Sequence, residues 1–516
     1  MGSPTQTWRT GSSSRILSRM RQDRESTGGV SPWGEAPLWT LLAVWCVITR
    51  LITRVTYLED PDSIRFALAV ADQYDVTALQ PHFPGYPVFW AIVKPIYVLT
   101  GSLSVSFSVV GGLATVLLVA AGLLMLPGNR LRSPEGLAWT VLVIWNPMVW
   151  LLGNRYMPDL LGAAVVLATV GFAIRAMRQA RTADALIAGT LFGLLGGLRL
   201  SYVPFALIPL AGVAWSVPRA RAALFGSTVI GTLVWFVPLM AYTGWEPMIS
   251  AAGRQTVGHF TEFGGTVLSE STASGDRIGR AIAAIWADGL GAWLPGRHLL
   301  TAVVAASVSA IGGRVLFVAL ITQKFESRDR SWLAFALRWL LPCVVLYSIW
   351  MVLYQNVLYK SRHVLPLLTV ALLVLSIGAI EVARKRIGRG IVASGTLAYA
   401  LVAVVLAAQH KEPTAIAQVV EQVRVISETE PDLRVVAVPL VTFMLKVQGV
   451  DATFVEADDR EAMALLNSDR EAGFSIVSIG MRLENKVPDT KSTFYHNPFV
   501  NRMWPEIPFY VYTSGH

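Results

Sequence analysis

Long apolar segments, each about as long as a membrane is thick, divide most of this chain. A helix needs about 20 apolar residues to cross a bilayer core of about 30 Å. Eleven segments meet this need: 37–56, 103–126, 136–153, 157–174, 183–198, 201–217, 222–243, 298–322, 331–354, 361–382 and 390–409. A composition of 53% hydrophobic and 15% charged residues in 516 does not fit one soluble core. We therefore predict a polytopic α-helical membrane protein.

Basic residues decide between eleven spans and twelve. The doubtful segment, 86–100, is short and contains Lys94 and two prolines. With eleven spans, five basic clusters share the side of the Arg-rich N-terminus, as the positive-inside rule requires. These clusters are Arg130/Arg132, Arg175/Arg178/Arg181, Arg219/Arg221, Lys324/Arg328/Arg330 and Arg384/Lys385/Arg386/Arg389. We predict that 86–100 is an amphipathic helix at the outer interface. A short true span is the alternative.

This topology divides the chain into three parts. Residues 1–36 form a cytoplasmic Arg-rich tail, 37–409 the transmembrane domain and 410–516 an extracytoplasmic domain. The first span is predicted to be an uncleaved transmembrane helix and not a signal peptide. The large outer loops are 57–102 and 244–297. We expect a multi-pass protein of the plasma membrane. The net charge of +9 then reflects membrane orientation, and no nucleic-acid partner is expected.

The C-terminal segment alternates helical and strand patterns. Helices are predicted at 415–429, 440–448 and 459–467, and strands at 433–438, 452–455 and 474–479. This order predicts a small α/β domain with partly parallel pairing. The domain lacks a Gly-rich phosphate loop, so nucleotide binding is unsupported. The aromatic segment 494–512 is expected to be a loop packed on a surface.

No cofactor is predicted from the ligand-forming residues. Both cysteines, Cys46 and Cys343, lie inside apolar segments, which gives no support to a disulfide framework or a Cys-based metal site. No cluster of His, Cys or Asp has metal-ligand spacing, although a divalent metal is left open.

Two carboxylates directly after the first span are candidate catalytic groups. Asp60 and Asp62 would lie where the local dielectric is lower than in water, which can raise a carboxyl pKa toward that of a general base. The structural alternative is that Asp62 caps a helix starting near Ser63, or that the carboxylates pair with Arg50 and Arg54. The sequence leaves both interpretations open.

A rigid turn follows some twenty residues later. His82-Phe83-Pro84-Gly85-Tyr86-Pro87 combines prolines and a glycine, which predicts a tight turn presenting His82 to the same outer cavity. His82 is thus a candidate contact for a ligand or phosphate, although a lone histidine is commonly structural.

Cations at outer helix ends are candidates for holding a lipid-linked phosphate. They are Arg155 with the nearby Asp159, then Arg199, and then Lys360, Arg362 and His363. Positive charge on the outer side opposes the orientation rule, so a phosphate ligand would explain it. Surface ion pairing among Arg155, Asp159 and their neighbours is the alternative. The outer loop 244–297 has the composition of a mobile lid.

These residues resemble the GT-C superfamily of integral-membrane glycosyltransferases, which use polyprenyl-phosphate sugars. The similarity is closest to the protein O-mannosyltransferase-like branch, in which an Asp-Ser pair precedes a His-Pro-Pro-Gly-Tyr-Pro-like turn; Asp62-Ser63 and 82–87 match this pattern. The resemblance covers residues 37–210. Arg65 and Phe83 depart from it, standing where the family often has an acid and a proline.

The resemblance implies inverting transfer of a sugar to an acceptor hydroxyl of a glycan, protein or lipid on the outer face. It maps the catalytic acid onto Asp62, with Asp60 as alternative, a second acid onto Asp159 with Arg155, and a donor-phosphate contact onto Arg362. Membrane lipids are the other expected partners. A ligase or polymerase of lipid-linked glycans and a non-enzymatic transporter are the competing functions.

Overall fold

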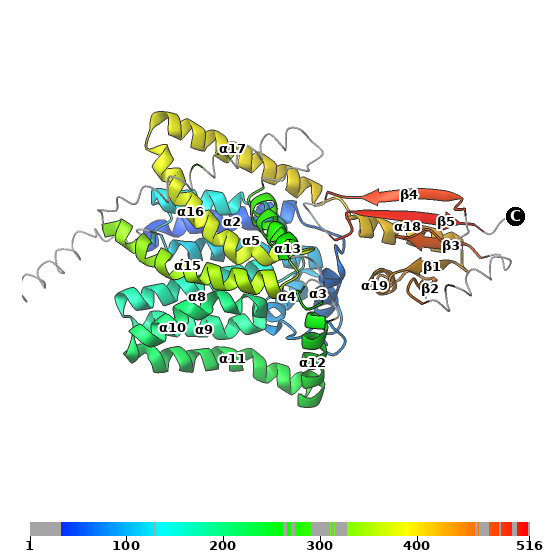
Figure 1. Ribbon diagram of the computed structural model, residues 1–516, viewed down its shortest axis with the longest axis horizontal. Helices are drawn as coiled ribbons and strands as arrows, with labels where there is room; N and C mark the ends of the chain where they lie inside the picture. Colours follow the sequence, from blue (N-terminus) through cyan, green and yellow to red (C-terminus); the bar gives the residue numbers. More distant parts are fainter. Residues whose placement is uncertain are drawn as a thin grey trace, which may run out of the picture.

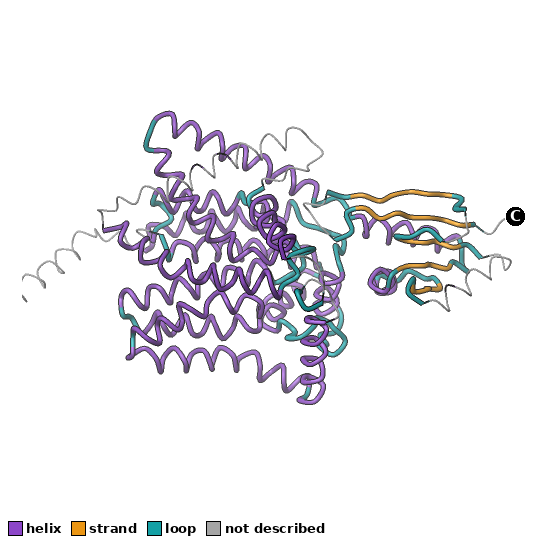
Figure 2. The backbone as a smooth tube through the Cα atoms, viewed as in Figure 1, coloured by secondary structure: helices purple, strands orange, loops and turns teal. Residues whose placement is uncertain are grey.

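The protein consists of a bundle of long helices and a small sheet domain beyond one end of it (Figures 1 and 2). The computed structural model describes residues 32–126, 129–261, 266–269, 274–291, 328–459, 474–483, 487–497 and 503–513, with Ala310, Arg314 and Met463. The predicted fold class, a polytopic helical protein with a small C-terminal α/β domain, matches this architecture.

Eight helices of 14 to 27 residues build the bundle. They are α5 (Leu103–Leu123), α8 (Asp159–Gln179), α9 (Thr182–Arg199), α10 (Val203–Ser216), α11 (Arg221–Thr243), α15 (Arg328–Tyr354), α16 (Leu365–Ala383) and α17 (Arg386–Gln409). Further helices join them: η1 (Pro32–Glu35), α2 (Ala36–Ile52), α3 (Pro61–Ala71), α4 (Pro87–Thr100), α6 (Pro134–Ile144), α7 (Pro147–Leu152), α12 (Trp245–Thr261) and α13 (Ser274–Ala283). Single turns are η3 (Leu200–Tyr202), η4 (Pro218–Ala220), η5 (Ala284–Gly289) and η6 (Ser361–Val364).

Glycines set how closely two of these helices approach. A Cβ at Gly193 would lie 2.4 Å from the carbonyl oxygen of Thr228, and one at Gly189 would lie 2.2 Å from Ser227 Oγ. The indole of Trp235 on α11 also donates to the Gly193 carbonyl at 2.9 Å. These glycines of α9 therefore permit a close approach to α11.

Seven stretches of the described residues are long and apolar enough to cross a membrane. One of them, Thr182–Ser216, contains α9 and α10, whose backbone leaves the helical conformation at Arg199. The expected span 136–153 is broken, because Asn146 caps α7 and Pro147 begins it. The span expected at 298–322 lies, apart from Ala310 and Arg314, outside the described residues. The count of eleven is thus not confirmed.

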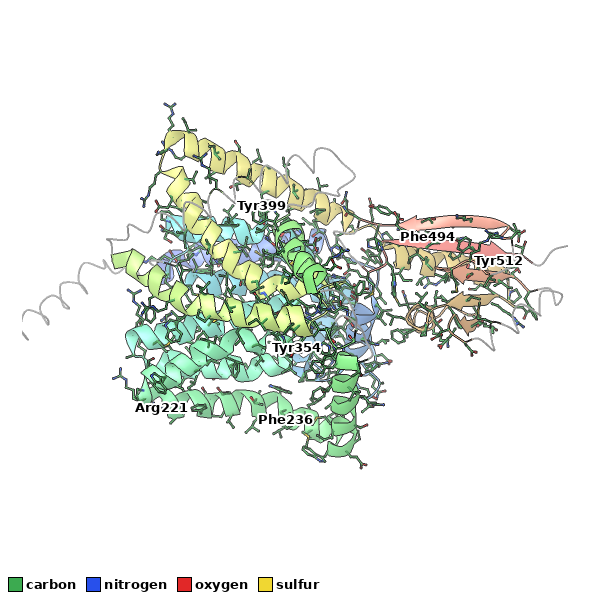
Figure 3. All side chains as sticks on the ribbon, in the orientation of Figure 1. Arg221, Phe236, Tyr354, Tyr399, Phe494 and Tyr512 are labelled. Atoms are coloured by element: carbon green, nitrogen blue, oxygen red, sulfur yellow. The ribbon has the colours of Figure 1, made fainter. Side chains whose placement is uncertain are left out.

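The described basic clusters lie at one end of the bundle. Turn η1, directly before α2, contacts the turn that carries the first basic cluster, because Arg132 donates to the Gly34 carbonyl at 2.9 Å. Arg175 pairs with Asp184 across the α8–α9 turn. Arg221 and the α16–α17 turn also lie at this end, opposite the sheet domain (Figures 1 and 3). The bundle therefore has the charge asymmetry on which the predicted topology depends.

A five-stranded sheet with the order β2-β1-β3-β5-β4 forms the core of the C-terminal domain. Its elements are α18 (Ala415–Thr429), β1 (Arg434–Ala437), α19 (Pro439–Val447), β2 (Thr453–Glu456), β3 (Ile476–Ile479), β4 (Thr490–Tyr495) and β5 (Glu506–Tyr512). Strand β1 pairs in parallel with β2 and β3, as predicted. The helix expected at 459–467 lies almost entirely outside the described residues.

The expected loop at 494–512 is wrong. Strands β4 and β5 pair antiparallel, with Tyr495 opposite Glu506, and β5 extends the sheet beside β3. Ile507 and Phe509 are buried in the domain core while Glu506 is exposed. This alternation along β5 fits a strand with one buried face.

Candidate active site

Asp60 begins the helix that carries Asp62. The Oδ1 atom of Asp60 accepts a hydrogen bond from the Ser63 backbone N–H at 2.8 Å, and Pro61 starts α3. The predicted cap, Asp62, is therefore wrong: Asp60 is the cap and Asp62 lies in the first turn. Freed from capping, the Asp62 carboxylate reaches other parts of the fold.

The arginines offered as partners for these carboxylates make other contacts. The Arg50 guanidinium lies 4.5 Å from the ring centroid of Trp150 and donates to Thr49. Arg54 donates to the Leu51 carbonyl at 2.9 Å. The predicted alternative of pairing with Arg50 and Arg54 is thus not what the structure shows.

Asp62 lies between three cations. Its Oδ2 accepts from Lys360 Nζ at 2.7 Å and from Arg362 Nη2 at 2.6 Å, and its Oδ1 is 3.6 Å from Arg65 Nη1. Burial by itself raises the pKa of the Asp62 carboxyl, but Lys360, Arg362 and His82 more than offset burial and hold the pKa well below its usual range. Asp62 is therefore an ionised carboxylate surrounded by positive charge.

Arg155 connects the two acids that precede α3. It lies in the loop between α7 and α8, and its Nε and Nη2 atoms each lie 3.0 Å from a carboxylate oxygen, of Glu59 and Asp60 respectively. The other Glu59 oxygen is 2.5 Å from His410 Nε2. Burial raises the Glu59 pKa, but Arg155 and His410 outweigh burial and lower it to about 2. Arg155 thus pairs with neighbouring acids, as the alternative of ion pairing expected, but these pairs are buried and do not lie at the surface.

Asp159 links Arg199 and Arg362 at the start of α8. Its Oδ1 atom is 2.8 Å from Arg199 Nη2 and 3.6 Å from Arg362 Nε. Tyr202 Oη donates to the Arg362 carbonyl at 3.1 Å, which fixes the backbone of η6. Arg362 also lies 3.8 Å from Asp60. One guanidinium therefore faces three of the predicted acids.

The predicted tight turn brings His82 to this cluster. The Gly85 N–H donates to the His82 carbonyl at 2.9 Å, and His82 Nε2 lies 2.9 Å from Tyr86 Oη, which is 3.4 Å from Arg199 Nη1. Burial, opposed by Asp62, lowers the His82 pKa to about 3. His82 is neutral at physiological pH, and its buried Nδ1 atom has no hydrogen-bond partner in the described part of the chain.

We expect Gly85→Ala to reduce the free energy of unfolding by about 1–3 kcal/mol, because Gly85 has a φ of +82°. A Cβ there would also lie 2.4 Å from Tyr74 Oη and 2.6 Å from Val76 Cγ2. Gly101→Ala is the matched control, since Gly101 has a φ of +63° but nothing within 4 Å of its added Cβ. Thermal unfolding in detergent should show the larger loss for Gly85→Ala. Equal losses would mean that the Tyr74 contact is unimportant.

His363 is buried beside the other basic residues. Its backbone carbonyl accepts from Tyr347 Oη at 2.8 Å, and its Nδ1 atom has no hydrogen-bond partner among the described residues. The short turn η6, between α15 and α16, thus carries Arg362 and His363, with Lys360 directly before it.

The outer loop 244–297, expected as a mobile lid, contains α12, α13 and η5. His259 Nε2 lies 2.7 Å from the carbonyl of Tyr354 at the end of α15 (Figure 3). Arg277 donates to the carbonyls of Val352 at 2.8 Å and Gln355 at 3.1 Å. The described residues of this loop are thus largely helical and docked on α15. The lid role stays a prediction.

All nine predicted site residues lie around this cluster, at the end of the bundle that faces the sheet domain. Direct contacts join seven of them, His82 is linked to Arg199 through Tyr86, and His363 is adjacent on η6. Sequence reasoning assigned no role to Glu59 and His410, which lie 351 positions apart and carried no local signal of their contact. Among the described residues, no three His, Cys, Asp or Glu side chains form a group that could hold a metal ion.

A solved structure shares this fold, although the two sequence comparisons find no match. No protein-family model matches the chain, and no curated protein matches it. ArnT from Cupriavidus metallidurans bound to undecaprenyl phosphate superposes with a TM-score of 0.52 at 11% identity, over 93% of this chain and 98% of that one. The same protein in the apo state gives 0.40 at 12% identity, over 93% and 99%. The first comparison confirms the predicted GT-C-like fold.

Proposed function

We propose that this chain is an integral-membrane glycosyltransferase that moves a sugar from a polyprenyl-phosphate donor to an acceptor hydroxyl, with inversion. The observation that carries the proposal is Asp62 in direct contact with Lys360 and Arg362 at one end of a membrane bundle. A base and two phosphate-binding cations are the groups that such a transfer needs.

The acceptor oxygen would attack the anomeric carbon while Asp62 takes its proton. The bond from that carbon to the phosphate oxygen then breaks, and its electron pair stays on the lipid phosphate, where Lys360 and Arg362 stabilise the charge. Asp60 is the alternative base, but its contacts favour Asp62 for this role. One carboxylate oxygen of Asp60 caps α3 and the other pairs with Arg155.

The low pKa of Asp62 makes it a weak base until a donor binds. An anionic phosphate at Lys360 and Arg362 would share their positive charge, so the pKa of Asp62 would rise toward that of a useful base. Donor binding would thus activate the site. Arg155, Asp159 and Arg199 hold this geometry, while His82 and His363 are candidate contacts for sugar or acceptor.

The lipid carrier and the membrane orientation have separate support. The ArnT structure of similar fold was solved with undecaprenyl phosphate, which favours a carrier of that kind. The positive-inside rule puts the basic end of the bundle, with the N-terminus, in the cytoplasm. The site and the C-terminal domain would then face the extracytoplasmic side of the cell membrane. A mannosyltransferase-like specificity stays a prediction from the resemblance.

Two measurements test the proposal. Mass spectrometry of lipids copurifying with the protein should find a polyprenyl phosphate bearing a hexose or pentose. In proteoliposomes with labelled polyprenyl-phosphate mannose, glucose or arabinose, and cell-envelope extract as acceptor source, one donor should release free polyprenyl phosphate. Movement of an intact donor across the bilayer without cleavage of its glycosidic bond would instead indicate a transporter. Transfer of whole glycans would indicate a ligase or polymerase.

A further inference from the structure

His410 joins the C-terminal domain to the loop that precedes the site. It directly follows α17, and its ring and the Glu59 side chain are almost completely buried. The His410 Nε2–H donates to Glu59 Oε1 at 2.5 Å, while its backbone carbonyl accepts from Tyr57 Oη at 2.8 Å. Two hydrogen bonds therefore fix residues 57–59 to the start of the C-terminal domain.

From Glu59, continuous contacts lead to the helix of Asp62. Glu59 Oε2 accepts from Arg155 Nε at 3.0 Å, and Arg155 Nη2 donates to Asp60 Oδ2 at the same distance. Asp60 in turn caps α3, with Asp62 in its first turn. A displacement of His410 would thus reach Asp62 through two ion pairs and a helix cap.

The same domain also holds α3 from another side. Ile64 of α3 is completely buried in the domain's hydrophobic core, where Val419 and Met444 are also buried. The Arg65 guanidinium lies 5.7 Å from the Phe443 ring centroid on α19. Figure 1 shows α19 next to α3. The C-terminal domain therefore contacts α3 directly as well as through Glu59.

We propose that Glu59 and His410 are positioning residues through which the C-terminal domain sets the orientation of Asp62. The inference rests on the proposed function, since it concerns the geometry of its base. The hydrogen bonds described for Glu59 and His410 go to Arg155, Tyr57 and each other, while Lys360 and Arg362 have their own bonds to Asp62, so replacing Glu59 or His410 keeps both phosphate-binding cations in the site. Such residues govern turnover more than donor binding, because small misplacements of a reacting group cost rate.

Two substitutions of His410 distinguish the loss of its hydrogen bond to Glu59 from a change in side-chain volume. His410→Leu removes the hydrogen-bond donor, whereas His410→Gln keeps an N–H group that can reach Glu59. In proteoliposomes, His410→Leu should lower kcat by about 10- to 100-fold with little change in the donor KM. His410→Gln should recover most of this loss. Glu59→Gln gives an independent measurement and should resemble His410→Leu.

Asp184→Asn is the matched control. Asp184 is a buried acid paired with Arg175 at 3.4 Å, at the opposite end of the bundle. The Asp184→Asn variant should have lower thermal stability but an unchanged kcat per folded molecule. The inference is overturned if His410→Leu and Glu59→Gln behave like this control, or if His410→Gln is no better than His410→Leu. If Asp62→Asn also keeps normal turnover, the proposed function itself fails; if only Asp62→Asn is inactive, the positioning role alone is wrong.

Discussion

Asp62→Asn is expected to lower sugar transfer by about 10²- to 10⁴-fold, the range that a general base contributes. The amide is almost isosteric with the carboxylate but cannot accept the acceptor's proton. It also keeps a carbonyl oxygen toward Lys360 and Arg362, so the donor should still bind. Steady-state release of polyprenyl phosphate in proteoliposomes measures the effect, with binding of labelled donor measured in parallel.

Two neighbouring acids provide the comparison. Asp72, exposed at the C-terminal end of α3, should tolerate Asp72→Asn without loss of rate. Asp60→Asn keeps a side-chain oxygen that can cap α3, because Asn and Asp are about equally good N-caps. It loses the negative charge that faces Arg155, and it should lower the rate less than Asp62→Asn. A normal rate for Asp62→Asn together with an inactive Asp60→Asn would transfer the role of base to Asp60.

Arg362→Ala should lower kcat by about 10²- to 10³-fold, because it removes a stabiliser of the departing phosphate. Arg362→Lys should recover only part of this loss, since a single ammonium cannot face Asp60, Asp62 and Asp159 together as the guanidinium does. Arg384→Ala, at an exposed pair with Glu381 at the other end of the bundle, is the control and should leave kcat unchanged.

The same variant predicts a shift in pH dependence. Arg362 lowers the pKa of Asp62, so its removal raises that pKa, and the ionised base is lost at higher pH as the solution is acidified. The acidic limb of the kcat/KM profile should therefore move to higher pH in Arg362→Ala. An unmoved limb would mean that Asp62 does not control it.

The sequence predicted those parts of the site that local chemistry determines. The turn at 82–87 follows from its prolines and Gly85, and the helix after Asp60 follows from Pro61 and a capping acid. Asp62 entered as the possible cap because two acids flank one proline and either could serve. Only the observed bond from Asp60 to the Ser63 N–H decides between them.

Contacts between distant segments were beyond this reasoning. Nothing near Glu59 indicates that His410 lies beside it, because the contact depends on the path of the whole bundle. The hairpin of β4 and β5 was missed for a related reason. Proline is unfavourable inside a strand, yet Pro508 lies opposite Thr493 in the sheet. The alternation of the buried Ile507 and Phe509 with less buried residues is the feature that identifies β5 as a strand.

The burial of Ile64 has a consequence for how the two parts of the chain depend on each other. An isoleucine from the membrane domain completes the interior of the C-terminal domain, and its side chain is 0% exposed. A protein truncated after Gln409 would leave this side chain facing water on a helix that had lost its support. The packing of α3 and the packing of the C-terminal domain therefore depend on each other.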